Sequence, residues 1–142
     1  MMTQQRLQAE KTVLEQRLKP NTYQFVDMET QKPYLIVGAM TNSGHVYTLK
    51  IMLEDFPYQV PRVCVMNELR DKNGKKLGKV SGPMHIIGKY EGHPLICHYG
   101  SFSWSPDVSL YKVFIKCRLW LEMYEEHLRS GKPIDYYLKH QS

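Results

Sequence analysis

The sequence LYKVFIKCRLWLEMYEEHL, at residues 110–128, has the most regular hydrophobic pattern in the chain. Its apolar residues recur at spacings of three and four, which is the period of one face of an α-helix. This stripe consists of Leu110, Val113, Phe114, Cys117, Leu121, Tyr124 and Leu128. Four further apolar residues widen it: Tyr111, Ile115, Leu119 and Trp120. The pattern predicts a long, largely buried helix that is capped at its start by Asp107 or Ser109 and ended by Gly131 with Pro133.

Upstream of this helix the pattern changes to the two-residue period of β-strands. Four strands are predicted: Tyr23–Met28, Tyr34–Met40, Val46–Leu53 and Arg62–Met66. The stretch Asn42-Ser43-Gly44 predicts a hairpin turn, and the prolines of Phe56–Pro61 exclude that segment from a strand.

Two more helices complete the predicted fold, one over Thr3–Leu18 and a short one over Ile134–His140. Together with the strands they predict an α+β fold, in which an N-terminal helix precedes a four-stranded antiparallel meander. Residues 67–103 are expected to form a long irregular loop, and such loops are usually functional. The first part of this loop, Glu68–Lys79, has five basic residues around Asn73-Gly74 and predicts an exposed basic hairpin.

The length of 142 residues predicts one domain over residues 1–142. The 19 basic and 14 acidic residues give 19 − 14 = +5, a charge that suits either an acidic partner surface or nucleic acid. No apolar run approaches the roughly 18 residues of a membrane span, and the first 19 residues are too polar for a signal peptide. We therefore expect a cytoplasmic protein that does not enter a membrane.

Three cysteines occur, at Cys64, Cys97 and Cys117, and no pair has the CxxC spacing. An odd number without paired spacing disfavours a disulfide framework. Cys64 lies in a predicted strand and Cys117 on the helix stripe, so both are expected to pack as small apolar groups. Cys97 lies in the loop beside His98, and local composition leaves it open between an inert thiol and a nucleophile.

Four residues of the same loop could in principle bind zinc: His85, His93, Cys97 and His98. Their spacing matches no standard zinc pattern, so we expect neither a metal nor another cofactor. A Cys–His hydrolase pair is also conceivable on composition, but the sequence identifies no third residue that would orient the histidine.

The order of the motifs is more informative than any single one. The segment Phe56-Pro57-Tyr58-Gln59-Val60-Pro61 precedes the fourth strand, a histidine precedes Ile96-Cys97, and Trp104-Ser105-Pro106 begins the long helix seven residues after Cys97. From about Leu7 to Leu128 this order resembles the ubiquitin-conjugating enzymes (the UBC fold). In that family a proline-rich segment, a histidine-proline-asparagine motif, an isoleucine-cysteine pair and tryptophan-serine-proline follow one another.

The chain also departs from the family pattern. His85-Ile86-Ile87 stands where histidine-proline-asparagine is expected, so the family's asparagine is missing. The hairpin Glu68–Lys79 looks like an insertion, and the usual closing helices are reduced to Ile134–His140. The stretch from Trp120 to Pro133 resembles divergent bacterial relatives, which are encoded beside an adenylating enzyme and often an antiphage system.

The resemblance implies roles for residues in the loop around Cys97. Cys97 would accept the C-terminal carboxylate of a ubiquitin-like protein as a thioester and pass it to an amine on a target protein. His85 would support the loop. A donor must replace the missing asparagine at the oxyanion, and His98 is the better candidate because it is next to Cys97, with His85, a backbone N–H or a bound partner as the alternatives. ATP would be used by the partner adenylating enzyme and not by this chain.

Two basic surfaces are candidates for docking the partners. The alternative for both is that they are simply solvent-exposed faces without a partner. One is on the first helix, at Arg6, Lys11 and Arg17, the face that binds the activating enzyme in the resembled family. The other is on the hairpin, at Lys72, Lys75 and Lys76, and suits an acidic face of the activating enzyme or of the modifier.

Two other functions compete with conjugation. An inactive UBC-like variant that only binds ubiquitin-like proteins is favoured by the missing asparagine and disfavoured by the retained Ile96-Cys97. Nucleic-acid binding is supported by the +5 charge and the basic hairpin. It is disfavoured because the chain has no recognised binding motif and its basic residues are not interleaved with aromatic ones.

Overall fold

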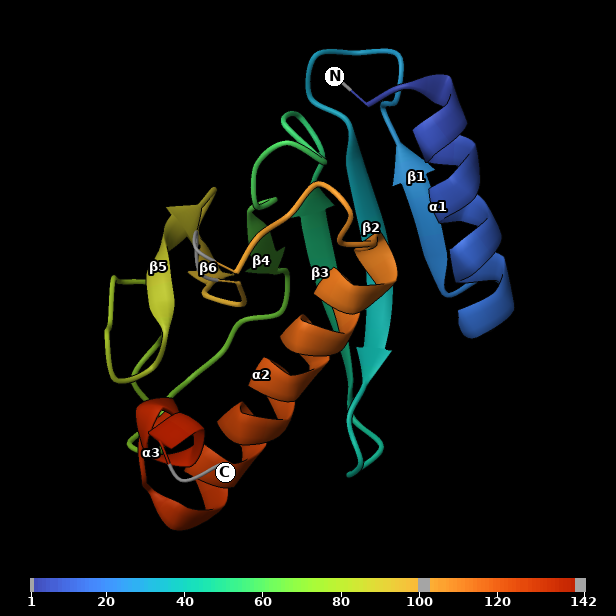
Figure 1. Ribbon diagram of the computed structural model, residues 1–142. Coiled ribbons are helices and arrows are strands. Elements are labelled where there is room, and N and C mark those ends of the chain that lie inside the picture. The colour runs from blue at the N-terminus through green and yellow to red at the C-terminus, as the bar shows by residue number, and fades with distance from the viewer. Residues whose placement is uncertain (1, 100–102, 140–142) are drawn as a thin grey trace.

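The computed structural model describes residues 2–99 and 103–139 (Figure 1). Its elements follow in the order α1 (Gln4–Arg17), β1 (Tyr23–Val26), β2 (Tyr34–Met40), β3 (Val46–Met52), β4 (Val63–Val65), β5 (Ile86–Tyr90), β6 (His93–Ile96), α2 (Leu110–Ser130) and α3 (Ile134–Lys139). The α+β class is confirmed, as are the first helix, the long helix and the turn after β2. His140, the last residue of the predicted closing helix, lies outside the described residues.

Within the described residues, one antiparallel sheet of six strands has the order β1-β2-β3-β4-β6-β5. The first four strands form the predicted meander, with somewhat shorter limits for β1, β3 and β4. The prolines of residues 56–61 keep that segment out of the sheet, as predicted.

The prediction of four strands and a structureless loop over residues 67–103 is wrong, because β5 and β6 form a further hairpin. Tyr90 pairs with His93, and the two residues between them, Glu91 and Gly92, have φ of 49° and 83°. Such turns favour Asn-Gly or Asp-Gly, so Glu91 concealed the signal. Pro94 concealed it further, since proline is rare in a strand with neighbours on both sides.

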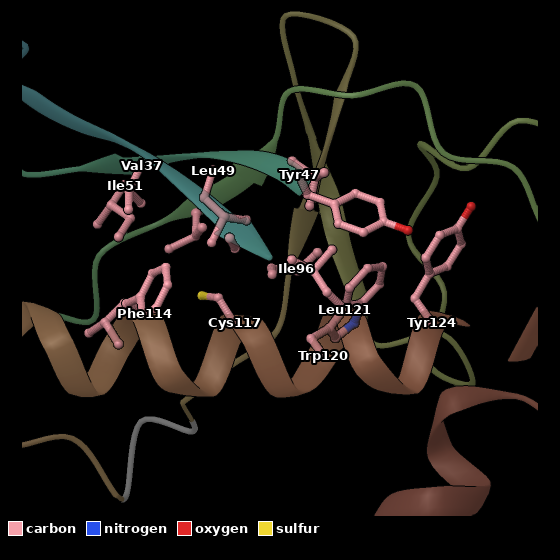
Figure 2. Packing of buried hydrophobic residues seen from close by; sticks show 14 of the residues in the cluster. Val37, Tyr47, Leu49, Ile51, Ile96, Phe114, Cys117, Trp120, Leu121 and Tyr124 are labelled. Carbon is pink, nitrogen blue, oxygen red and sulfur yellow. The ribbon is translucent and has the colours of Figure 1, made fainter. Parts of the chain in front are cut away.

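Helix α2 lies across one face of the sheet, and the core forms between them (Figures 1 and 2). Its predicted stripe is buried from Leu110 to Tyr124. Two apolar positions are exceptions to the prediction: Ile115, two residues after Val113, faces away from the sheet and is 41% exposed, and Leu128 is 42% exposed. In the last turn the buried residue is His127, because its ring is hydrogen-bonded to backbone groups on both sides.

Both ends of α2 are capped as helix ends usually are. The hydroxyl of Ser109 accepts the N–H of Lys112, so Ser109 is the N-cap and Asp107 is not. Gly131 ends the helix with φ of 80°, a conformation that residues with a Cβ rarely adopt.

Helix α1 is joined to the start of α2 by a buried carboxylate. Glu10 is 4% exposed, and its Oε1 accepts the N–H of Leu110 at 2.8 Å while its Oε2 accepts Nε–H of Arg6 at 2.7 Å. The same guanidinium donates to the carbonyls of Pro106 and Val108. Arg6 and Glu10 therefore fix where the long helix begins relative to α1.

None of the described helices combines the length and the apolar character that crossing a bilayer requires.

Candidate functional site

Cys97 is the first residue after β6, on the connection between β6 and α2, and it is partly exposed. Its backbone N–H donates to the carbonyl of His85 at 2.8 Å. The other two thiols, Cys64 and Cys117, are both 0% exposed. Burial raises the pKa of each, which disfavours the reactive thiolate. Both are packing residues, as expected, and Cys97 is the cysteine of the three that is partly exposed.

The segment before β5 connects Cys97 with two helices. The carbonyls of residues 83–85 each accept a hydrogen bond, in order from the backbone N–H of Asp135 at 2.8 Å, the indole N–H of Trp120 at 3.1 Å and the backbone N–H of Cys97 at 2.8 Å. Three consecutive carbonyls are thus held by α3, α2 and the end of β6. This arrangement fixes the backbone of the segment from three directions.

His85 occupies the last position of that segment and has a positive φ of 52°. Its Nε2 is 3.1 Å from a carboxylate oxygen of Asp135 in α3. The predicted role of His85 in supporting the loop stays a prediction, and these contacts are the ones that such a role requires. Asp135 was not identified from the sequence, although an acidic residue in the first turn of a helix is a common N-terminal signal.

His98 has a fixed tautomer. Its Nε2 is 2.8 Å from the carbonyl oxygen of Pro61, and since a carbonyl can only accept, Nε2 carries the proton. Burial lowers the pKa of the ring, so its neutral form is favoured. Nδ1 is then a buried acceptor, and it has no hydrogen-bond partner among the described residues. The N–H of the neutral ring is thus bonded to Pro61 and its lone pair is buried.

Aromatic side chains join the Cys97 loop to the proline segment at residues 56–61. Trp104 donates its indole N–H to the carbonyl of Pro57 at 2.9 Å. Tyr99 stands edge-on to the rings of both His98 and Trp104, with centroid distances of 5.9 and 5.5 Å. The proline segment is therefore held near both ends by the ring N–H groups of two residues that follow Cys97 in the sequence, His98 and Trp104. Trp104 thus anchors the approach to α2 on the proline segment.

The four zinc candidates of the sequence do not form a ligand cluster. In residues 2–99 and 103–139, no three His, Cys, Asp or Glu side chains are grouped closely enough to hold a metal ion. His85 instead contacts Asp135, and His98 contacts Pro61.

The basic residues of α1 have different environments. Arg6 makes three internal hydrogen bonds, so it serves the joint with α2. Lys11 lies over the ring of Phe25, and Arg17 over the ring of Tyr111, each at 5.7 Å from the centroid. Arg17 is exposed, whereas Arg6 and Lys11 are partly buried.

The basic hairpin is confirmed, with Arg70 paired to Lys76 across its turn. Tyr124 of α2 binds both backbone groups of Arg70, and Nε2 of His127 accepts the N–H of Lys72 at 3.1 Å. The side chains of Lys72, Lys75 and Lys76 are exposed, and Lys76 is 3.8 Å from Glu68. The hairpin is therefore docked by its backbone and leaves its lysines outward.

No family model, no curated protein and no solved structure matches this chain. The function must therefore be argued from the site itself.

Proposed function

We propose that this chain is a conjugating enzyme for a ubiquitin-like protein, with the UBC fold, and that Cys97 carries the modifier as a thioester. The observation that supports this most is the contrast among the three thiols. Cys97 is partly exposed on a backbone anchored to His85, whereas Cys64 and Cys117 are fully buried. The order of helix, antiparallel sheet, cysteine loop and long helix agrees with the family resemblance.

The proposed chemistry consists of two acyl transfers. First, the Cys97 thiolate attacks the thioester carbonyl of the modifier on the adenylating enzyme. A C–S bond to Cys97 forms, and the C–S bond to the donor breaks as that sulfur leaves as a thiolate. Second, an amine of the target attacks the same carbon, a C–N bond forms, Cys97 leaves as a thiolate, and the amine gives up a proton. A cytoplasmic location suits this cycle, since the cytoplasm keeps free thiols reduced.

The second step needs a hydrogen-bond donor for its oxyanion. The backbone N–H of Cys97 is already bonded to His85, and the ring N–H of neutral His98 is bonded to Pro61. We therefore assign the donor role to a partner protein or to another backbone N–H of the loop. The ring of His98 is buried and neutral, and its N–H is committed to Pro61, so we do not assign it the donor role.

Partner docking is proposed for two surfaces. Lys11 and Arg17 on α1 face the adenylating enzyme, and the outward lysines of the hairpin, Lys72, Lys75 and Lys76, meet an acidic face of the adenylating enzyme or of the modifier. Such contacts between exposed charges weaken with salt. Reversing Lys75 and Lys76 to Glu should slow thioester formation at low salt and have less effect at high salt.

The second candidate is an inactive module that only binds ubiquitin-like proteins. It is favoured because Ile87 stands where the resembled family has its asparagine. The two functions differ in whether a covalent adduct forms. In an extract of cells that naturally express the protein, supplemented with ATP, we expect an adduct that reductant removes. Cys97→Ala should abolish it, whereas Cys64→Ala should retain it. Non-covalent retention of a small protein without any such adduct would favour the binding module.

A further inference from the structure

Helix α3 is attached to the segment before β5, residues 83–85, at two points. The N–H of Asp135 donates to the carbonyl of Pro83, and its carboxylate is 3.1 Å from Nε2 of His85. Ile134 beside it is 0% exposed and holds α3 to the hydrophobic core. Helix α3 is thus a fixed support for the segment at residues 83–85.

His85 can transmit this support because its side chain and its backbone carbonyl are both in contact with other parts of the chain. Its side chain contacts α3 and its carbonyl accepts the N–H of Cys97. With φ of 52° it has a backbone conformation that is uncommon for residues with a side chain, and such conformations persist when the surroundings hold them. If the contact with Asp135 is lost, the His85–Ile86 peptide keeps the hydrogen bond from the Ile86 N–H to the Ser81 carbonyl but loses the side-chain support from α3, and the hydrogen bond to Cys97 loosens.

We propose that Asp135 is a positioning residue, which acts through His85 to set the peptide, and hence the thiol, of Cys97. Its effect on catalysis rests on the proposed function, whereas its effect on the Cys97 backbone does not. The hydrogen bond from Cys97 N–H is the step that connects the two, and this bond can be observed directly.

The first test is an NMR measurement of the Cys97 amide in the full chain. We expect Asp135→Ala to shift the amide proton upfield and to speed its hydrogen exchange at least about tenfold, because its acceptor becomes mobile. Asp135→Asn keeps an oxygen acceptor for His85 and should restore the wild-type resonance. Glu126→Gln, which alters an exposed ion pair with Arg129 on α2, is the matched control and should change nothing.

A second variant keeps the proposal falsifiable if Asp135→Ala does not fold. His85→Asn tolerates the positive φ but has too short a side chain to maintain the ring's contact with Asp135. It should reproduce the change at Cys97. An unchanged Cys97 amide in a folded Asp135→Ala or His85→Asn protein would overturn the proposal.

The catalytic part is tested by the kinetics of thioester formation. Misplacing the thiol should lower kcat for charging by about tenfold in Asp135→Ala while KM for the charged adenylating enzyme stays unchanged. Recovery in Asp135→Asn supports positioning. A changed KM with an unchanged kcat would instead identify Asp135 as a docking residue and overturn the proposal. If the wild-type protein forms no thioester, the proposed function fails, and the amide measurement still decides the positioning.

Discussion

The buried carboxylate of Glu10 should be one of the most sensitive positions in the fold. In Glu10→Ala, the N–H of Leu110 loses its acceptor in a buried place, which costs about 1–3 kcal/mol. The charge-assisted hydrogen bond from Arg6 is also lost, which costs about 1.5–3 kcal/mol. Arg6 keeps two carbonyl acceptors and its side chain is partly exposed, so water and the carbonyls limit the cost of its lost counter-charge, and we expect a total loss of about 3–4 kcal/mol.

Urea unfolding, followed by circular dichroism and by tryptophan fluorescence, measures this loss. Glu10→Gln retains an oxygen for Leu110 and loses the charge, so it should cost about half as much as Glu10→Ala. Glu15→Ala, on the exposed side of the same helix, is the matched control and should stay within about 0.5 kcal/mol of the wild type. A Glu10→Ala protein as stable as the control would refute this account of the joint between α1 and α2.

Three further predictions follow from the described contacts. Iodoacetamide should alkylate Cys97 in the native protein while Cys64 reacts only on unfolding, and equal rates by peptide mass spectrometry would contradict the burial. Burial holds the pKa of His98 below its usual range, so below about pH 6.5 the unfolded chain binds more protons than the folded one. The free energy of unfolding should therefore decrease as the pH is lowered below that value. This decrease should be smaller in His98→Gln, and a pH profile of unfolding that is the same as in the wild type would contradict the contribution of His98. Gly131→Ala should cost about 1–2 kcal/mol in urea unfolding, because φ is 80° and its Cβ would meet the Lys72 side chain, whereas Gly78→Ala should be near neutral.

Periodic patterns in the sequence were sufficient to predict α2 and the first four strands. The α2 stripe follows from hydrophobic spacing alone, because one helix face packs on one sheet face, as Figure 2 shows. The β5–β6 hairpin was missed because its turn uses Glu91 and its inner strand contains Pro94, and local propensity disfavours both. Tertiary pairing with β4 overrides that propensity, which a local pattern does not reveal.

The candidate site was predicted in part for a similar reason. Cys97 was distinguished from Cys64 and Cys117 by its place in a loop, since strand and helix periodicity predicts burial of the other two. The contacts that hold Cys97 join residues far apart in the sequence, such as His85 with Asp135, and no spacing rule connects them. The same holds for Glu10, which interrupts an apolar face in the sequence and is buried because a helix N-terminus 100 residues away needs an acceptor.

The central claim, that Cys97 carries an acyl group, is tested most directly by trapping that group. In Cys97→Lys, transfer of the modifier to the substituted side chain gives an amide that reductant does not cleave. After incubation in the ATP-supplemented extract, tryptic peptide mass spectrometry should find the modifier's C-terminal residue attached at position 97. The same ATP-dependent attachment at another position, with position 97 unmodified, would contradict the claim.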